Sequence, residues 1–94
     1  MSASQTPQTF SLEQNFPNPF NSSTQIRYSL REAGEMDLSL YNLTGQMVAT
    51  LVEGRREAGS YAVSMDARDY ASGVYLYRLR SGANVETRKL VLVR

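Results

Sequence analysis

The sequence SGVYLYRLRSGANVETRKLVLVR (residues 72–94) predicts two β-strands joined by a tight turn. Within its first half, residues 73–80, successive side chains alternate in character with the two-residue period of a strand. The arginines mark one face as solvent-facing, so Tyr75, Tyr77 and Leu79 are expected to point into a core. The SGAN segment that follows contains the glycine and the asparagine that a chain reversal favours.

The returning strand, residues 85–93, ends in KLVLV, which is apolar on both faces. An edge strand with one side in water does not require a second apolar face. We therefore expect this strand either to be buried on both faces or to keep one face for a partner. The sequence leaves these two alternatives open.

Alternating segments with turn residues between them recur along the rest of the chain at spacings of about 8 to 14 residues, which is typical of a sandwich. Residues 46–53 are predicted to be a strand rather than a helix, because the run is short and has a glycine at each end. Residues 54–59 are expected to form a charged loop, and residues 66–72 a single helical turn capped by aspartates. The predicted inward-facing residues of these segments are Ile26, Tyr28, Leu30, Met36, Leu38, Leu40, Tyr61, Val63 and Met65.

Six clear strands and one from residues 10–21 predict an all-β fold, an immunoglobulin-like antiparallel β-sandwich of about seven strands. Residues 1–9 are small and polar, and residues 1–11 are expected to be a flexible linker. Residues 12–94 form one predicted domain, which is long enough for a modest core.

The segment FSLEQNFPNPFN (residues 10–21) is expected to form a rigid N-terminal arm over one end of the core. Its two prolines fix two φ angles and remove two backbone donors, so this segment cannot be a central strand. Its two later phenylalanines are the expected apolar anchors, and its asparagines are expected to close local turns. A motif that binds aromatic grooves is the weaker alternative, because the PxxP spacing is absent. The predicted structural residues of the arm are Phe16, Pro17, Asn18, Pro19 and Phe20.

The composition argues against an enzyme and against a bound cofactor. The chain has no cysteine and no histidine, so the commonest general base and the commonest metal ligand are both missing. Asp66 and Asp69 could contribute to a calcium site, but Arg68 lies between them, and turn closure accounts for them better. No apolar run reaches the roughly 18 residues of a membrane span.

The net charge of +1 gives little support for nucleic-acid binding. The charge is nevertheless uneven, because five basic residues and one acid follow residue 73 while five basic residues and eight acids precede it. Such a basic end can favour an anionic partner, although ordinary solvated strand positions explain it better.

Four blocks of the sequence together resemble a known family. They are LEQNFPNPFNSSTQIRYSL (residues 12–30), LYNLTGQMVATLVEG (40–54), AGSYAVSMDA (58–67), and SGVYLYRLRSG followed by TRKLVLVR (72–94). In their order and spacing they resemble the type A C-terminal sorting domain of the type IX (Por) secretion system. The departures are Ser22, where the family often has proline, and Arg94, where lysine is common.

This resemblance implies a sorting signal rather than an enzyme. Such domains lie at the C-terminus of secreted proteins of Bacteroidetes-related bacteria, with the cargo upstream in the same polypeptide. After export to the periplasm, the outer-membrane translocon recognises the domain, and a cell-surface sortase then removes it. The resemblance therefore implies a secreted or cell-surface protein, with cleavage in the linker before Leu12.

The resemblance carries over Gly73, Tyr75 and residues 89–94 as recognition elements. We expect a partner to read this end of the chain by adding a strand to the sheet edge, aided by the basic residues of the preceding strand. The full predicted recognition set is Gly73, Tyr75, Arg78, Arg80, Lys89, Leu90, Val91, Leu92, Val93 and Arg94.

Two alternative functions remain open at this point. The chain is also similar to the immunoglobulin-like spacer domain of flagellar hook-capping proteins. A carbohydrate-binding module would need aromatic side chains on one flat face, and only Tyr41 has outward parity in the clearly alternating segments. The sequence does not indicate the oligomeric state.

Overall fold

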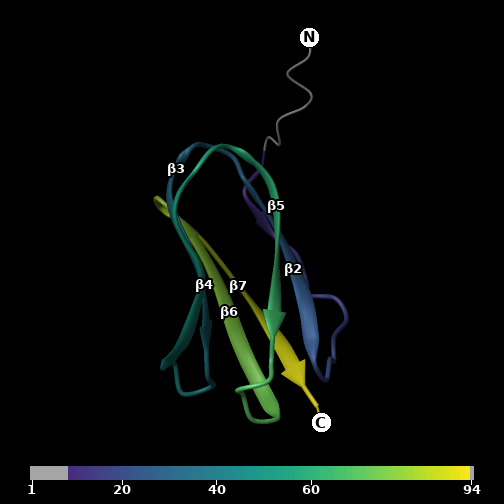
Figure 1. The fold of residues 1–94 in the computed structure, drawn as a ribbon. Coiled ribbons are helices and arrows are strands. Elements are labelled where there is room, and N and C mark those ends of the chain that lie inside the picture. The colour runs from purple at the N-terminus through teal and green to yellow at the C-terminus, as the bar shows by residue number, and fades with distance from the viewer. Residues whose placement is uncertain (1–8, 94) are drawn as a thin grey trace.

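Two antiparallel sheets pack face to face in the structure, a computed structural model that describes residues 9–93 (Figure 1). The three-stranded sheet has the order β1-β2-β5, and the four-stranded sheet has the order β4-β3-β6-β7. The strands are β1 (Ser11–Leu12), β2 (Ser23–Leu30), β3 (Gly34–Tyr41), β4 (Met47–Arg56), β5 (Gly59–Asp66), β6 (Gly73–Ser81) and β7 (Asn84–Leu92).

The connections explain how seven short strands form two layers. The chain makes hairpins between β3 and β4 and between β6 and β7, and it crosses from one sheet to the other after β2, β4 and β5. This topology confirms the predicted immunoglobulin-like β-sandwich. It also leaves β4 and β7 as the two edges of the four-stranded sheet.

The core lies between the sheets and follows the predicted alternation. Every second residue of β2, β3 and the C-terminal half of β6 is buried, because successive side chains of a strand point to opposite faces. Each large apolar side chain buried in this way contributes about 1.5 to 3 kcal/mol. The buried hydrophobic residues are Leu12, Phe20, Ile26, Tyr28, Leu30, Met36, Leu38, Leu40, Met65, Ala67, Tyr77, Leu79, Leu90 and Leu92.

The predicted loop at residues 54–59 is wrong, because β4 continues to Arg56 and β5 begins at Gly59. The register of the β3–β4 hairpin gives the reason. Arg55 and Arg56 pair with the first residues of β3, so backbone hydrogen bonding extends the strand through a charged sequence.

The predicted helical turn at residues 66–72 is also wrong, because Asp66 ends β5 and residues 67–72 contain turns, bends and irregular backbone but no helix. Its first residue instead closes a tight local turn, in which Asp66 Oδ1 accepts a hydrogen bond from the Arg68 amide at 2.9 Å. The second carboxylate oxygen forms a 2.6 Å ion pair with the Arg68 guanidinium.

Strand pairing begins before Leu12. Ser11 pairs with Ser29 in β1–β2, and Phe10 packs against the core. The rest of the predicted linker, apart from Thr9, lies outside the described residues. Nowhere in the described part of the chain is there a helix long and apolar enough to cross a membrane.

Candidate functional site

The β6–β7 hairpin has one face in the core and one face toward solvent. Leu90 and Leu92 of β7 are buried, as are Tyr77 and Leu79 of β6, while Tyr75 is half-buried against the core. On the opposite face of β7, Val91 is half-buried, and Val93, which directly follows the strand, is 46% exposed. The structure thus decides between the two alternatives for the C-terminal strand. The strand is buried on one face only, and its second apolar face remains accessible.

The outer face of the four-stranded sheet can be read from the strand registers, because directly paired residues project to the same side. The end that carries Val93 is mostly apolar, and the opposite end is polar and charged. Across β4, β3, β6 and β7 the successive rows are Met47–Tyr41–Leu76–Lys89, then Thr50–Ser39–Arg78–Thr87, then Glu53–Asp37–Arg80–Val85. Next to the first row, toward the end that carries Val93, Val74 of β6 pairs with Val91 of β7.

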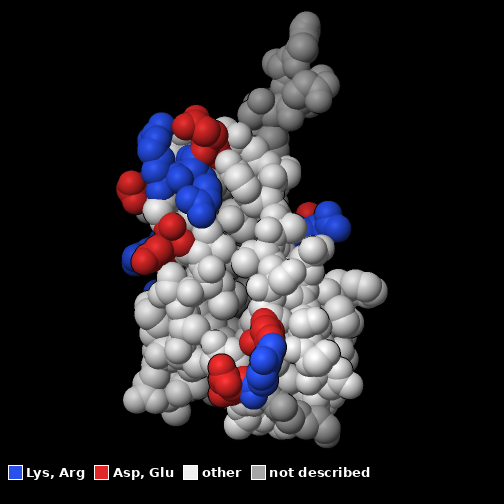
Figure 2. Space-filling model, in the orientation of Figure 1, with Lys and Arg blue, Asp and Glu red and all other residues white. Residues whose placement is uncertain are grey.

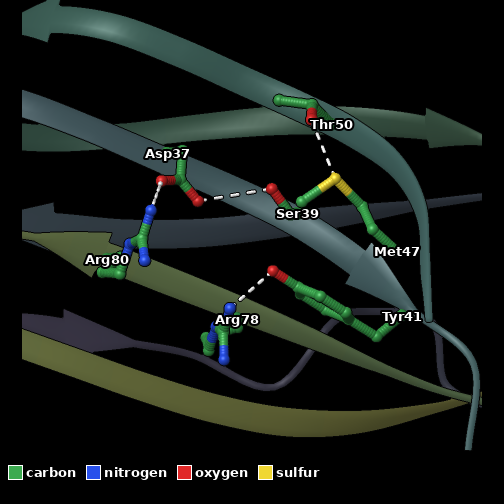
Figure 3. Close-up of polar contacts among 7 residues, drawn as sticks. All are labelled: Asp37, Ser39, Tyr41, Met47, Thr50, Arg78 and Arg80. Atoms are coloured by element: carbon green, nitrogen blue, oxygen red, sulfur yellow. Dashed lines mark hydrogen bonds and ion pairs between the residues drawn. The ribbon is translucent and has the colours of Figure 1, made fainter. Parts of the chain in front are cut away.

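Two arginines of β6 are held by partners on β3 (Figure 3). Arg80 Nη2 lies 3.1 Å from Asp37 Oδ2, and Arg78 Nη2 donates a 2.6 Å hydrogen bond to the Tyr41 hydroxyl. The Arg78 guanidinium carbon also lies 4.6 Å from the centre of the Tyr41 ring, within the range of a cation–π contact. Its Nε atom is buried and has no hydrogen-bond partner among residues 9–93.

The contact with Arg78 matters for the carbohydrate-binding alternative. Tyr41 is the outward aromatic residue on which a flat sugar-binding face would depend, and its ring is covered by the guanidinium. The described residues therefore do not form an open aromatic platform at this position.

The N-terminal arm, residues 10–21, is hydrogen-bonded to both sheets. On the β2 side, Glu13 N donates to Arg27 O at 2.9 Å, and Phe16 and Gln25 exchange two backbone hydrogen bonds of 3.0 Å. On the β7 side, Phe20 N donates to Val91 O at 3.1 Å and Phe20 O accepts from Val93 N at 2.8 Å. The arm therefore closes one open side of the sandwich by bridging β2 to β7.

Side chains of the arm add further contacts to the edge of β7. Asn18 Oδ1 accepts a 3.0 Å hydrogen bond from Val91 N, and Gln14 Nε2 donates a 2.7 Å bond to Lys89 O. These bonds occupy both backbone groups of Val91, the carbonyl group of Lys89 and the amide of Val93. The expectation of a free edge for strand addition at this end of β7 is therefore wrong, because the arm itself occupies that edge. Arg94 lies outside the described residues.

Only one of the two expected aromatic anchors holds the arm. Phe20 is buried, as predicted, but Phe16 is 80% exposed and is not an anchor. Asn18 is likewise bonded to β7 rather than to a local turn. Since residues 16 and 20 pair with different sheets, the bridging geometry sends only the second ring into the core. The peptide bonds before Pro17 and Pro19 are both cis.

Besides Phe20, three polar groups that the sequence did not indicate as anchors hold the arm. They are the side-chain amide of Asn15, the hydroxyl of Thr24 and the hydroxyl of Tyr77. Asn15 is only 2% exposed, and its Nδ2 donates to Thr24 Oγ1 at 3.0 Å and to Pro17 O at 3.1 Å. The Asn15 amide donates to the Tyr77 hydroxyl, which in turn donates to Glu13 O, both at 2.8 Å. Burial raises the pKa of Tyr77 above its ordinary value of 10.0. Hydrophobic periodicity carries no signal for these contacts, because they join polar atoms, and those of Tyr77 span more than 60 positions of the chain.

The predicted recognition residues separate into two groups. Arg78, Arg80, Lys89, Val91 and Val93 lie on the outer face of the sheet, while Tyr75, Leu90 and Leu92 face inward. Gly73 begins β6 and pairs with Leu92. The Tyr75 hydroxyl donates to Ala71 O at 2.6 Å, and its ring packs edge-on against Tyr70 with centroids 6.3 Å apart. Leu90 and Leu92 hold the hairpin in the core and are not available to a partner as surface, while Tyr75 is half-buried and the bond of its hydroxyl to Ala71 is exposed.

The charges visible on one side of the molecule form small groups of mixed sign rather than one large patch (Figure 2). One group lies over the upper ends of β3 and β5 and another below the end of β5 (Figures 1 and 2). Among residues 9–93, no group of three or more acidic side chains is placed to hold a metal ion.

Comparison with known proteins gives a family match for this domain. A family model described as a secretion system C-terminal sorting domain matches residues 14–93. The match thus begins inside the arm and ends at the last outward valine of the C-terminal segment. No curated protein matches the chain.

Proposed function

The chain belongs to the family of type IX secretion system C-terminal sorting domains and is thus a signal for export across the outer membrane, and we propose that the translocon reads the outer face of its β6–β7 hairpin. The observation that carries this proposal is the two-sided construction of β7. Its inner leucines fix the strand in the core, while Lys89, Val91 and Val93 stay on the outer face.

Recognition of the outer face is compatible with many different cargo proteins. A translocon that accepts unrelated cargo must bind features that belong to the domain alone. Such features are supplied by a rigid sheet face with an apolar end and with basic side chains at Lys89 and Arg80. Because β7 is already hydrogen-bonded to the arm between Lys89 and Val93, side chains rather than a newly added strand mediate this contact.

The domain itself catalyses no reaction in this proposal. The family resemblance supports a route in which a cell-surface sortase acts after translocation and cleaves the polypeptide before Leu12. The structure is compatible with such processing, because a cut there would spare β2 to β7 and all of the arm from Leu12 onward. The cargo would then remain on the cell surface or be released.

The proposal can be tested with the domain fused to a reporter cargo in a host that has type IX machinery. The test variant carries Lys89→Glu and Val93→Asp, which change exposed outer-face side chains and leave the buried leucines intact. We expect secretion of the reporter to fall at least about tenfold, because a charged group is placed in an apolar contact and a basic one is reversed.

The matched control is Arg27→Glu, which makes the same kind of charge change at an exposed position of β2, in the opposite sheet. We expect this control to be secreted at the level of the unchanged domain. Both variants should keep the circular dichroism spectrum of the folded domain. Normal secretion of the Lys89→Glu, Val93→Asp variant would refute the proposed recognition face.

A further inference from the structure

Phe16 is the most exposed large hydrophobic residue in the described part of the chain, with 80% of its surface accessible. Its position is unusual, since the residue directly before it is buried and Phe20 of the same arm lies in the core. Among residues 9–93 nothing covers most of this phenyl ring, and exposed apolar groups that join into one patch mark protein-binding surfaces.

The backbone that carries Phe16 is held rigidly. Its amide and its carbonyl group both bond to Gln25 at 3.0 Å. On one side Asn15 is tied to Thr24 and Tyr77, and on the other side Pro17 O accepts a 2.8 Å bond from the Thr24 hydroxyl. An aromatic side chain on such a fixed backbone loses little conformational freedom on binding, which favours affinity.

The surface that follows Phe16 in the arm continues directly to the end of β7. A hollow of about 450 Å³ lies there, and its apolar wall is formed by Pro17, Pro19, Phe20 and Val93. The backbone bonds between Phe20 and residues 91 and 93 join the arm to the C-terminal segment as one surface. A partner that contacts Val93 therefore lies next to the arm as well.

We propose that Phe16 is the apolar anchor through which the domain binds its receptor in the secretion machinery, and that this receptor has an apolar pocket that takes up the phenyl ring. The proposal rests on the proposed function and specifies how the same surface is read. The receptor pocket receives Phe16, and the rim of that pocket lies against the prolines and Val93.

A second copy of this chain is a less suitable binding partner for Phe16 than a different protein. The hollow beside the arm has an apolar wall against which the ring of another copy could pack. The rest of its lining is polar, consisting of Asn21, Ser22 and Ser23, and a phenyl ring placed there would cover polar groups without bonding to them. An apolar pocket in a different protein suits the ring better.

The experiment uses the reporter fusion with Phe16→Ala, Phe16→Leu and Leu43→Ala. Leu43 is a matched control, since it is 63% exposed and lies in the turn between β3 and β4, at the other edge of the four-stranded sheet. We expect Phe16→Ala to lower secretion about 10- to 100-fold, since the apolar burial of the ring is lost. Phe16→Leu should retain much of the activity, and Leu43→Ala should be secreted normally.

Two further measurements make the result unambiguous. Thermal unfolding of each purified domain should show unchanged stability for Phe16→Ala, since the ring makes few contacts within the domain. A photo-crosslinking phenylalanine analogue at position 16 should form an adduct with a component of the translocon in cells that export the fusion.

The possible outcomes separate this inference from the function on which it rests. If Phe16→Ala is secreted normally while Lys89→Glu, Val93→Asp is not, the anchor is refuted and the recognition face stands. If the unchanged fusion is not exported at all, the proposed function itself fails. If the unchanged domain dimerises in solution and Phe16→Ala is monomeric, the ring binds a second copy and the receptor pocket is refuted.

Discussion

The hydroxyl group of Tyr77 accepts a 2.8 Å hydrogen bond from the backbone amide of Asn15, across 62 positions of the chain. The same hydroxyl donates to the carbonyl group of Glu13 at 2.8 Å. One side chain of a core strand thus holds two backbone groups of the N-terminal arm. The arm in turn covers the edge of β7, so the surface proposed for export depends on this buried contact.

The first prediction concerns the Tyr77 hydroxyl. Replacement Tyr77→Phe keeps the ring but leaves the buried Asn15 amide and the Glu13 carbonyl group without this partner. We expect a loss of about 1 to 3 kcal/mol in the free energy of unfolding, measured by urea denaturation. Tyr75→Phe is the control and should cost less, because the bond of that hydroxyl to Ala71 is exposed. Equal losses in the two variants would contradict this account of the arm.

The second prediction distinguishes the two phenylalanines of the arm. Phe20→Ala removes a ring that is 3% exposed and should destabilise the domain by about 3 to 5 kcal/mol. Phe16→Ala should change the unfolding free energy by less than about 0.5 kcal/mol, because its ring lies in solvent. Calorimetric unfolding of the two variants checks both values. A strong destabilisation by Phe16→Ala would show that its ring has a structural role.

The third prediction concerns Arg78, whose guanidinium stacks on the Tyr41 ring and bonds to its hydroxyl. Lysine keeps the charge but lacks the planar group, so Arg78→Lys should cost about 0.5 to 2 kcal/mol of stability. If the role of Arg78 is to hold the sheet face together, secretion of the reporter should change little wherever the variant remains folded. A large loss of secretion at unchanged stability would instead indicate that a partner contacts this arginine directly.

The fourth prediction follows from the burial of the C-terminal strand. Removal of residues 90–94 deletes Leu90 and Leu92, which are both almost fully buried, and each such loss costs about 2 to 5 kcal/mol. Against a typical domain stability of about 5 to 15 kcal/mol, we expect the truncated domain to be largely unfolded by circular dichroism. Lost secretion of a truncated fusion would then report unfolding, which is why substitutions on the outer face are the better test. A truncated domain that stays folded would contradict the burial described above.

The fifth prediction concerns alkaline pH. Burial raises the pKa of Tyr77 and of Tyr28 above 10.0, so the folded state holds their protons more tightly than the unfolded chain does. This contribution to stability is fully present below pH 10.0 and is lost as the pH rises from 10.0 through the raised values. We expect the urea midpoint to fall over that range, and to fall less steeply in Tyr77→Phe. An unchanged slope in the variant would rule out Tyr77 as a source of the effect.

The alternation of residues was sufficient to predict most of the fold. Ile26, Leu38 and Tyr77 point inward as expected, because a strand sends successive side chains to opposite faces whatever it pairs with. The alternation did not predict the length of a strand where pairing with a neighbouring strand determines it. Arg55 and Arg56 read as a loop by their charge, but hydrogen bonds to β3 extend the strand through them.

The sequence by itself determined which segments form strands, which face of each is apolar and, through its blocks of residues, the family to which the domain belongs. Only the tertiary structure decided that the edge of β7 is covered and that Phe20 is buried while Phe16 is exposed. These outcomes depend on hydrogen bonds between Asn15, Asn18 and distant strands. Such bonds form only when two sheets bring remote polar groups within about 3 Å of one another, and no local pattern of residues encodes that distance.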